Sequence, residues 1–240
     1  MTDPAALRAR LDSVRDRIAR AARRAGREPS SVRLVAISKT FPAEDVRAAA
    51  AAGQIDFGEN KVQEALQKMS ETSRLALTWH LVGHLQSNKA RKAGAAFDVV
   101  QSVDDAAVVA KLDEAAGVSS RRLELLVQID LAGEPTKHGA RPEDLPSILE
   151  AAGRCRFARI KGLMVLPPAS ADAEHARPFF AALRRLRDDL VARGADGSLL
   201  SELSMGMSGD FEVAIEEGAT IVRIGSAIFG RRGVRDEEIG

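Results

Sequence analysis

Hydrophobic positions near the N-terminus follow the spacing of a helix. Asp3 can cap this helix, and Pro4 suits its first position. We therefore expect residues 1–28 to form an N-terminal helix that packs on the rest of the fold. Four apolar residues recur at intervals that place them on one helix face: Leu7, Leu11, Val14 and Ile18.

From residue 32 onward, short runs of apolar and β-branched residues alternate with helical stretches. Eight βα units in 240 residues fit a closed (β/α)8 barrel of the TIM type, typically about 250 residues long, better than an open doubly wound sheet. No linker or low-complexity segment interrupts the alternation, so we expect one α/β domain over residues 1–240 with a tail over 230–240. The predicted strands are Val32–Ser38, Ile55–Glu59, Thr78–Val82, Asp98–Ser102, Leu123–Ile129, Arg159–Val165, Glu202–Gly206 and Ile221–Gly225.

Composition limits the partners and the chemistry that the chain can have. Lys and Arg total 35 against 34 acidic residues, so the net charge of +1 predicts neither a nucleic-acid partner nor an anionic membrane surface. No apolar run is long enough to cross a bilayer and no signal-peptide core is present, so we expect a cytoplasmic protein. The single cysteine, Cys155, is interpreted as an incidental thiol. Tyrosine is absent, which removes the phenol from any mechanism.

Residues with unusual chemistry fall at the ends of the predicted strands, where (β/α)8 barrels build their active sites. Lys39 directly follows the first apolar strand. Partial desolvation there favours the neutral, nucleophilic amine that forms imines. A solvated or ion-paired lysine is the alternative interpretation.

Two Gly/Ser segments end the last two strands, where barrels often bind phosphate. Ser208 can cap a helix that starts near Asp210, and Gly225 and Ser226 let the backbone approach an anion closely. Ordinary turn and cap roles are the alternative. Alternation along the last strand places Arg223 on the face of Gly225, where it either contacts a ligand or pairs with Glu202 or Glu212.

The histidines do not form a recognisable metal motif. His80 and His84 share one strand parity, but no third histidine or cysteine follows at metal-ligand spacing. We therefore predict no metal site and a hydrogen-bonding role for both. Lys137-His138-Gly139, after the fifth strand, is either a cationic loop at the mouth of the barrel or an ordinary solvated loop.

Taken together, these segments resemble the pyridoxal phosphate homeostasis protein family, also called the proline synthetase co-transcribed or YggS family. The likeness covers nearly the whole chain in order. It is carried by six segments: Leu34–Thr40, Phe57–Glu64, Trp79–Lys89, Ile160–Met164, Leu203–Asp210 and Val222–Gly230.

The resemblance implies a fold-type III barrel like the N-terminal domain of bacterial alanine racemase, with pyridoxal 5′-phosphate (PLP) as cofactor. It implies that Lys39 forms the internal aldimine and that Arg223 faces the pyridine nitrogen. Asn60 matches a polar neighbour of the cofactor. The implied phosphate contacts are Ser208, Gly225 and Ser226; the family often has threonine at the last of these positions.

These expectations favour a PLP carrier that acts in homeostasis over an enzyme, so no residue is assigned a catalytic role. An arginine against the ring nitrogen keeps that nitrogen unprotonated, which makes the ring a poor electron sink. The resemblance also implies that racemases of this fold use a partner-subunit tyrosine, which this chain lacks, although His84 or Lys137 could replace it as a base.

An amino-acid racemase remains the main alternative function. A phosphosugar enzyme with an aldolase-like lysine is a second alternative. Without a second domain to build a racemase-like dimer we expect a monomer, with apo PLP-dependent enzymes as possible recipients of the cofactor.

Overall fold

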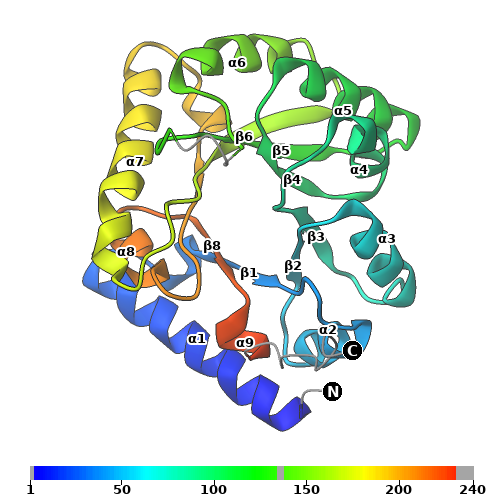
Figure 1. Cartoon of the computed structure of the whole chain (residues 1–240), viewed down its shortest axis with the longest axis vertical. Helices are drawn as coiled ribbons and strands as arrows, with labels where there is room; N and C mark the ends of the chain where they lie inside the picture. The colour runs from blue at the N-terminus through cyan, green and yellow to red at the C-terminus, as the bar shows by residue number, and fades with distance from the viewer. Residues whose placement is uncertain (1–2, 134–137, 231–240) are drawn as a thin grey trace, which may run out of the picture.

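A computed structural model describes residues 3–133 and 138–230, and its centre is a closed barrel of eight parallel strands in sequence order (Figure 1). Pairing of β1 with β8, with Val35 opposite Arg223, closes the barrel. The strands confirm all eight predicted runs within two residues at each end. They are β1 Arg33–Ile37, β2 Asp56–Glu59, β3 Thr78–Leu81, β4 Val99–Val103, β5 Leu123–Gln128, β6 Ala158–Met164, β7 Glu202–Ser204 and β8 Ile221–Ile224.

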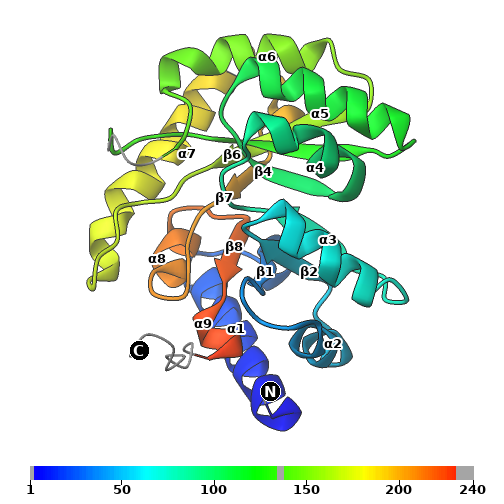
Figure 2. The same cartoon turned by 45° about the vertical axis from the view of Figure 1, so that its right-hand side comes forward.

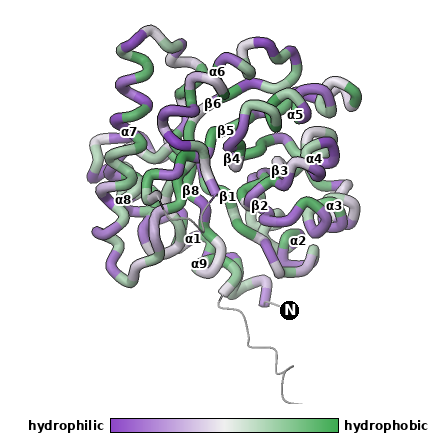
Figure 3. The backbone as a smooth tube through the Cα atoms, turned by 45° about the horizontal axis from the view of Figure 1, so that its top comes forward, coloured by the Kyte–Doolittle hydropathy of each residue, from purple (hydrophilic) through white to green (hydrophobic). Residues whose placement is uncertain are grey.

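Helices surround the barrel on its outer side (Figures 1 and 2). Hydrophobic residues concentrate along the strands, whereas hydrophilic ones alternate with them around the outer helices (Figure 3). The arrangement is therefore the predicted (β/α)8 barrel. The α-helices in the described part of the chain are α1 Pro4–Arg24, α2 Ala43–Ala51, α3 Val62–Glu71, α4 Ala90–Ala96, α5 Ala106–Val118, α6 Leu145–Gly153, α7 Arg177–Ala192, α8 Phe211–Glu216 and α9 Ser226–Phe229.

Helix α1 begins where the sequence predicts, because the Asp3 side chain accepts a hydrogen bond from the Ala5 N–H at 3.1 Å. Its four predicted apolar residues are all buried. The helix lies against α8 and α9, and Arg10 Nε donates to the Ile228 carbonyl at 2.6 Å. The first helix and the last one are thus joined side by side, as Figure 2 also shows.

Alternation along the strands creates two apolar layers. The larger one lies between the strands and the outer helices. A smaller cluster fills the inside of the barrel with Val35, Ile37, Val82, Val99, Leu126, Met164 and Ile221. The interior is a packed core, so ligands can reach the barrel only at its ends.

Two expectations from composition can be compared with the fold. Among the described helices, none is both long and apolar enough to span a bilayer. Cys155 is half-buried, and burial raises the pKa of its thiol to about 11. A thiol with so high a pKa is almost wholly protonated near neutral pH, which agrees with the interpretation of Cys155 as an incidental thiol.

Candidate functional site

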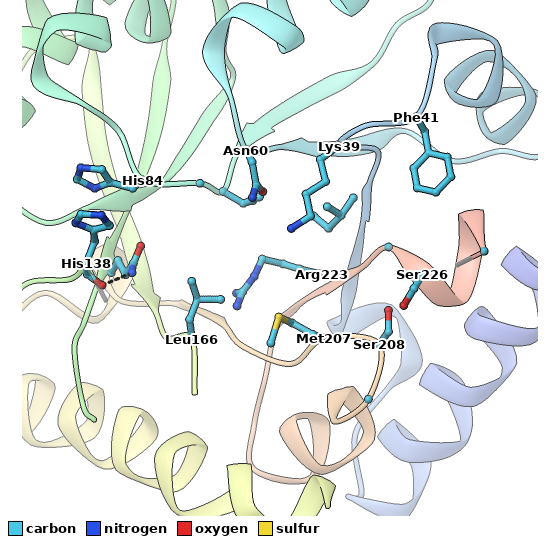
Figure 4. Close-up of a pocket in the computed structure, with 17 residues that line it drawn as sticks. Lys39, Phe41, Asn60, His84, His138, Leu166, Met207, Ser208, Arg223 and Ser226 are labelled. Carbon is cyan, nitrogen blue, oxygen red and sulfur yellow. Dashed lines mark hydrogen bonds between the residues drawn. The ribbon is translucent and has the colours of Figure 1, made fainter. Parts of the chain in front are cut away.

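A cavity of about 670 Å³ opens at the carboxyl ends of the strands (Figure 4). It brings together residues of β1, β5 and β8 and residues of the loops that follow β1, β2, β3, β5, β6, β7 and β8. A pocket of this size at this end of a (β/α)8 barrel is the usual place for a small-molecule site. All six residues singled out as ligand contacts line it: Lys39, Asn60, Ser208, Arg223, Gly225 and Ser226.

Lys39 lies two residues beyond β1, half-buried, and its side chain extends into the cavity (Figure 4). The next residue, Thr40, has φ of 69°, a left-handed conformation that L-residues with a Cβ rarely adopt. The Thr40 N–H donates to Glu64 Oε1 at 2.6 Å. This hydrogen bond holds the strained turn and with it the start of the Lys39 side chain.

Behind this turn lies a buried polar network that the sequence pattern does not predict. The Lys68 ammonium donates to Glu59 Oε1 and to the Ser38 carbonyl, each at 2.7 Å, and to Glu64 Oε1 at 2.9 Å. Ser38 Oγ also donates to Glu59 Oε1 at 2.6 Å. Residues on both sides of Lys39 are therefore fixed by one ammonium group from α3.

The two carboxylates of this network respond differently to their surroundings. Burial raises the pKa of Glu59, and the hydrogen bonds from Lys68 and Ser38 offset only part of that rise. Burial also acts to raise the pKa of Glu64, but the bonds from Lys68 and Thr40 outweigh it and leave that pKa lowered. Glu59 Oε2 is buried without a hydrogen-bond partner. The ion pair with Lys68 thus offsets part of the free-energy cost of burying the Glu59 carboxylate.

Hydroxyl groups gather at one end of the cavity, where Ser208 and Ser226 face each other (Figure 4). Ser208 Oγ accepts a hydrogen bond from the Ala227 N–H at 3.4 Å, which links the loops after β7 and β8. The expectation that Ser208 caps the following helix is wrong. Helix α8 starts at Phe211, and the carboxylate of the preceding residue, Asp210, accepts the Met207 N–H at 2.6 Å.

An aromatic pair packs beside the Ser208–Ser226 end of the cavity. The Phe41 and Phe229 rings stack with centroids 5.0 Å apart. Phe41 belongs to the loop after β1, and Phe229 ends α9. The contact therefore ties the loop that carries Lys39 to the helix that begins at Ser226.

Arg223 forms the floor of the cavity, and its guanidinium ends near the middle of the pocket (Figure 4). Its Nη1 donates to Ser204 Oγ at 2.6 Å, and its Nη2 donates to the Val165 carbonyl at 2.9 Å. Burial lowers the pKa of Arg223 to about 10, and the nearby Asp210 carboxylate partly offsets this. The group is therefore a fixed cation near neutral pH.

The alternative role of Arg223, an ion pair with Glu202 or Glu212, is not the one that the structure has. Glu202 accepts a hydrogen bond from Thr220 Oγ1 at 2.5 Å, and Glu212 forms a two-pronged pair with Arg17 of α1 at 2.8 and 3.0 Å. Both carboxylates already have partners elsewhere. Strand parity placed Arg223 on the inner face, but it could not show which groups meet it there.

A hydrogen-bond chain continues from Arg223 through the barrel interior. Ser204 Oγ donates to Gln101 Oε1 at 2.6 Å, and Gln101 Nε2 meets His80 Nδ1 at 2.9 Å. His80 Nε2 lies 3.0 Å from Asp56 Oδ1. Since the amide nitrogen of Gln101 can only donate, His80 carries its proton on Nε2 and donates it to Asp56. Every donor points away from the pocket, and the predicted hydrogen-bonding role of His80 is confirmed.

Asn60 is positioned by close contact between two loops. A Cβ atom on Gly83 would lie 2.3 Å from the Asn60 carbonyl oxygen. Only glycine permits this approach of the loop after β3 to the loop after β2. Asn60 is thereby held at the side of the cavity near Lys39 (Figure 4).

The far end of the cavity carries a second cluster, in which His84 and His138 stack with ring centroids 3.5 Å apart (Figure 4). His84 Nδ1 lies 3.4 Å from Asp104 Oδ2. Burial raises the pKa of Asp104, and the two imidazoles partly offset this. Lys137, named above with His84, lies outside the described residues.

The fold and the pocket define a class of protein. The chain matches the family model described as "Alanine racemase, N-terminal domain" over residues 9–233. An alanine racemase from Clostridium difficile superposes with a TM-score of 0.71 at 14% identity; the match covers 96% of this chain and 58% of the racemase, and it shows the fold alone. The class is thus the fold-type III barrel.

More similar proteins narrow this class. A pyridoxal phosphate homeostasis protein from Pseudomonas aeruginosa is 45% identical over 92% of this chain and 94% of its own length. PipY of Synechococcus elongatus, solved with PLP bound, has a TM-score of 0.82 at 42% identity, with 93% of this chain and all of PipY covered. The chain belongs to the pyridoxal phosphate homeostasis protein family.

Proposed function

We propose that the protein binds PLP in this cavity and serves as a carrier that holds the cofactor reversibly, rather than as an enzyme. The observation that carries the proposal is the meeting of the Lys39 amine, the Arg223 guanidinium and the Ser208 and Ser226 hydroxyls around one pocket. PipY, whose structure was solved with PLP, supports the choice of ligand.

The residues around the cavity fit each part of PLP. Hydroxyls and glycine backbone at the Ser208–Ser226 end suit a phosphate group. Lys39 Nζ would hold the aldehyde carbon covalently, with loss of water, and Arg223 would donate a hydrogen bond to the ring nitrogen. Asn60 would contact the ring from the side near Lys39. Bound PLP supplies an aldehyde carbon that can pass between amines.

Two features favour carrying over turnover. The buried Arg223 stays protonated near neutral pH, so it would keep the ring nitrogen without a proton and weaken the ring as an electron sink. The sequence contains no tyrosine to act as a second base. Holding the cofactor in this way would limit free aldehyde and influence vitamin B6, amino-acid and keto-acid pools.

The test of binding is a titration of the full-length protein with PLP, followed by borohydride reduction and peptide mapping. We expect a near-visible absorbance band and a reduced adduct on the peptide that contains Lys39. Lys39→Ala should lose both. Lys61→Ala is the matched control, because Lys61 is an exposed lysine shortly after Asn60 and does not line the cavity. An unchanged band and adduct in Lys39→Ala would disprove the assignment.

Turnover is tested separately with the PLP-loaded protein in deuterated water. We expect no appreciable exchange of the α-proton across a panel of amino acids. Rapid exchange would show a racemase-like enzyme instead. Transfer to a recipient is tested by mixing loaded protein with an apo PLP-dependent enzyme and measuring the recovery of that enzyme's activity.

A further inference from the structure

Three side chains meet at the end of the cavity opposite the serine hydroxyls, and the proposed cofactor contacts do not include them. His84 follows β3, Asp104 follows β4 and His138 lies in the loop after β5. Because β3, β4 and β5 are neighbours in the barrel, their carboxyl ends bring these residues to one place. One imidazole nitrogen from each histidine and one carboxylate oxygen lie within 4.8 Å of one another.

The contact between His84 and Asp104 has the spacing of two metal ligands. Their nearest atoms, Nδ1 and Oδ2, are 3.4 Å apart, longer than a typical N–H···O hydrogen bond of about 2.7–3.2 Å. Two ligands that each lie about 2.1 Å from a tetrahedral zinc ion are separated by roughly 3.4 Å. The pair is therefore too far apart for a good hydrogen bond and correctly spaced for a shared ion.

The second histidine completes the set. The His84 and His138 rings are nearly parallel, at 10°, with centroids 3.5 Å apart. Each imidazole offers a ring nitrogen that can act as a metal ligand. Both rings are exposed at the rim. In-plane lone pairs of two stacked rings run nearly parallel, so ion binding would require the His138 ring to tilt out of the stack.

The charged side chains around this cluster indicate whether it favours a cation or an anion. The Asp104 side chain is only 18% exposed, which makes its negative charge costly without a cation beside it. Asp105 lies next to it and adds a second carboxylate to the adjoining small cavity. Lys111 is the single lysine that lines this cavity within the described residues. Two carboxylates against one ammonium group favour a cation over an anion.

We propose that His84, Asp104 and His138 form a binding site for a divalent transition-metal ion, with Zn²⁺ the best match, at the rim of the cavity. Imidazole and carboxylate are the ligands that zinc uses, together with cysteine. Three protein ligands leave one position of a tetrahedral ion open. An ion there can hold water or an anionic group of a molecule in the cavity. The proposal does not depend on PLP binding.

The test uses the full-length protein freed of PLP and titrated with ZnCl₂ in a calorimeter. We expect one saturable ion per chain. Asp104→Asn, His84→Gln and His138→Gln should each weaken Zn²⁺ binding at least about tenfold, since loss even of a group that merely orients a ligand often costs that much. His175→Gln is the control, because His175 is an exposed histidine beside Ser170 and lies outside both cavities.

A second measurement, with cobalt(II), includes wild type and a control variant and so guards against a misfolded ligand variant. Cobalt(II) should give visible absorption bands of tetrahedral intensity with wild type and His175→Gln, and these bands should vanish with His138→Gln. If no ion binds to wild type, the His84–Asp104 contact is an ordinary ion pair and the proposal is wrong. If Zn²⁺ binds equally well to wild type and all three ligand variants, the ion sits elsewhere and the proposal is wrong too.

Discussion

At the scale of single residues, His80 occupies a buried position that requires one hydrogen-bond acceptor and one donor on the same side chain. It is fully buried, accepts from Gln101 through Nδ1 and donates to Asp56 through Nε2. A histidine in such a position is sensitive to shape as well as to polarity, because both neighbours lose a partner when it is removed.

We predict that His80→Leu lowers the free energy of unfolding by about 1–3 kcal/mol more than His80→Gln does. Glutamine can accept from Gln101 with its oxygen and donate to Asp56 with its nitrogen, whereas leucine leaves both groups unpaired. Urea denaturation of the two variants measures the difference. Equal losses in both variants would mean that the site responds only to lost volume.

Lys68 is a second residue whose contribution to stability depends on its surroundings. We predict that Lys68→Met lowers the free energy of unfolding by about 3–5 kcal/mol near neutral pH, because it strands the buried Glu59 carboxylate. Lys61→Met, which changes an exposed lysine of the same segment, should cost less than about 0.5 kcal/mol.

The penalty for Lys68→Met should also depend on pH. Burial raises the folded-state pKa of Glu59, so its unfavourable effect is absent below the unfolded pKa of about 4.3 and grows as pH rises through the folded value. Denaturation curves in acid should therefore bring the variant closer to wild type. A penalty that stays constant from acid to neutral pH would contradict this assignment.

At the scale of elements, Arg177 joins α7 to α8 through Glu216 at 2.8 Å and Glu217 at 2.9 Å. The hydrogen bond from Arg177, together with one from Arg24, lowers the pKa of Glu216 despite some burial. A lowered folded pKa gives stability that is present above the unfolded value of about 4.3 and lost as pH falls. This sign is opposite to that of Glu59.

We accordingly predict that Arg177→Ala costs up to about 1 kcal/mol at neutral pH, since the pairs are partly exposed. The difference from wild type should shrink in acid as Glu216 becomes protonated. High salt should shrink it as well. Thermal denaturation at two pH values and two salt concentrations tests this, and a difference that survives acid would point to lost packing instead.

The elements were predictable because strands and helices carry different apolar spacings. Where the ends differ, a backbone cause is visible: β7 stops at Ser204 rather than Gly206, which has φ of 94° and turns the chain away from the sheet. The lining of one cavity by the six candidate residues was predictable because barrel chemistry concentrates at strand ends. Their partners were not, because those depend on register and on contacts between distant segments.

Two cases show the limit. Lys68 looks like a solvated residue on a helix, and only its position behind the β1 turn makes it a buried cation. His84 and His138 are 54 residues apart in the sequence, so spacing along the chain did not indicate that their rings stack. The order of strands in the barrel is what brings their loops together.

At the scale of the whole molecule, closure of the barrel by β1 and β8 should make unfolding cooperative. We propose that the described chain unfolds as one domain. Trp79, the single tryptophan, is buried in β3 against Phe57 and reports tertiary packing. Its fluorescence and the far-ultraviolet circular dichroism should give coincident urea transitions. Two separated transitions would reveal more than one folding unit.

The monomeric state that we expect belongs to this scale too. Light scattering at two protein concentrations should give the mass of one chain at both. A mass that doubles with concentration would reveal self-association, and the rim of the cavity would then have to be considered as part of an interface.

The hydrogen-bond chain from Arg223 to Asp56 has a consequence for the way this pocket can evolve or be redesigned. Its links come from five strands, and each link fixes the donor direction of the next. A substitution at Arg223 that removes its donor to Ser204 would leave the Ser204 hydroxyl without that hydrogen bond, while the remaining groups of the chain still donate towards Asp56. Substitutions in the floor of the pocket should therefore occur together with substitutions further along the hydrogen-bond chain, as far as Asp56 at the opposite end of the barrel.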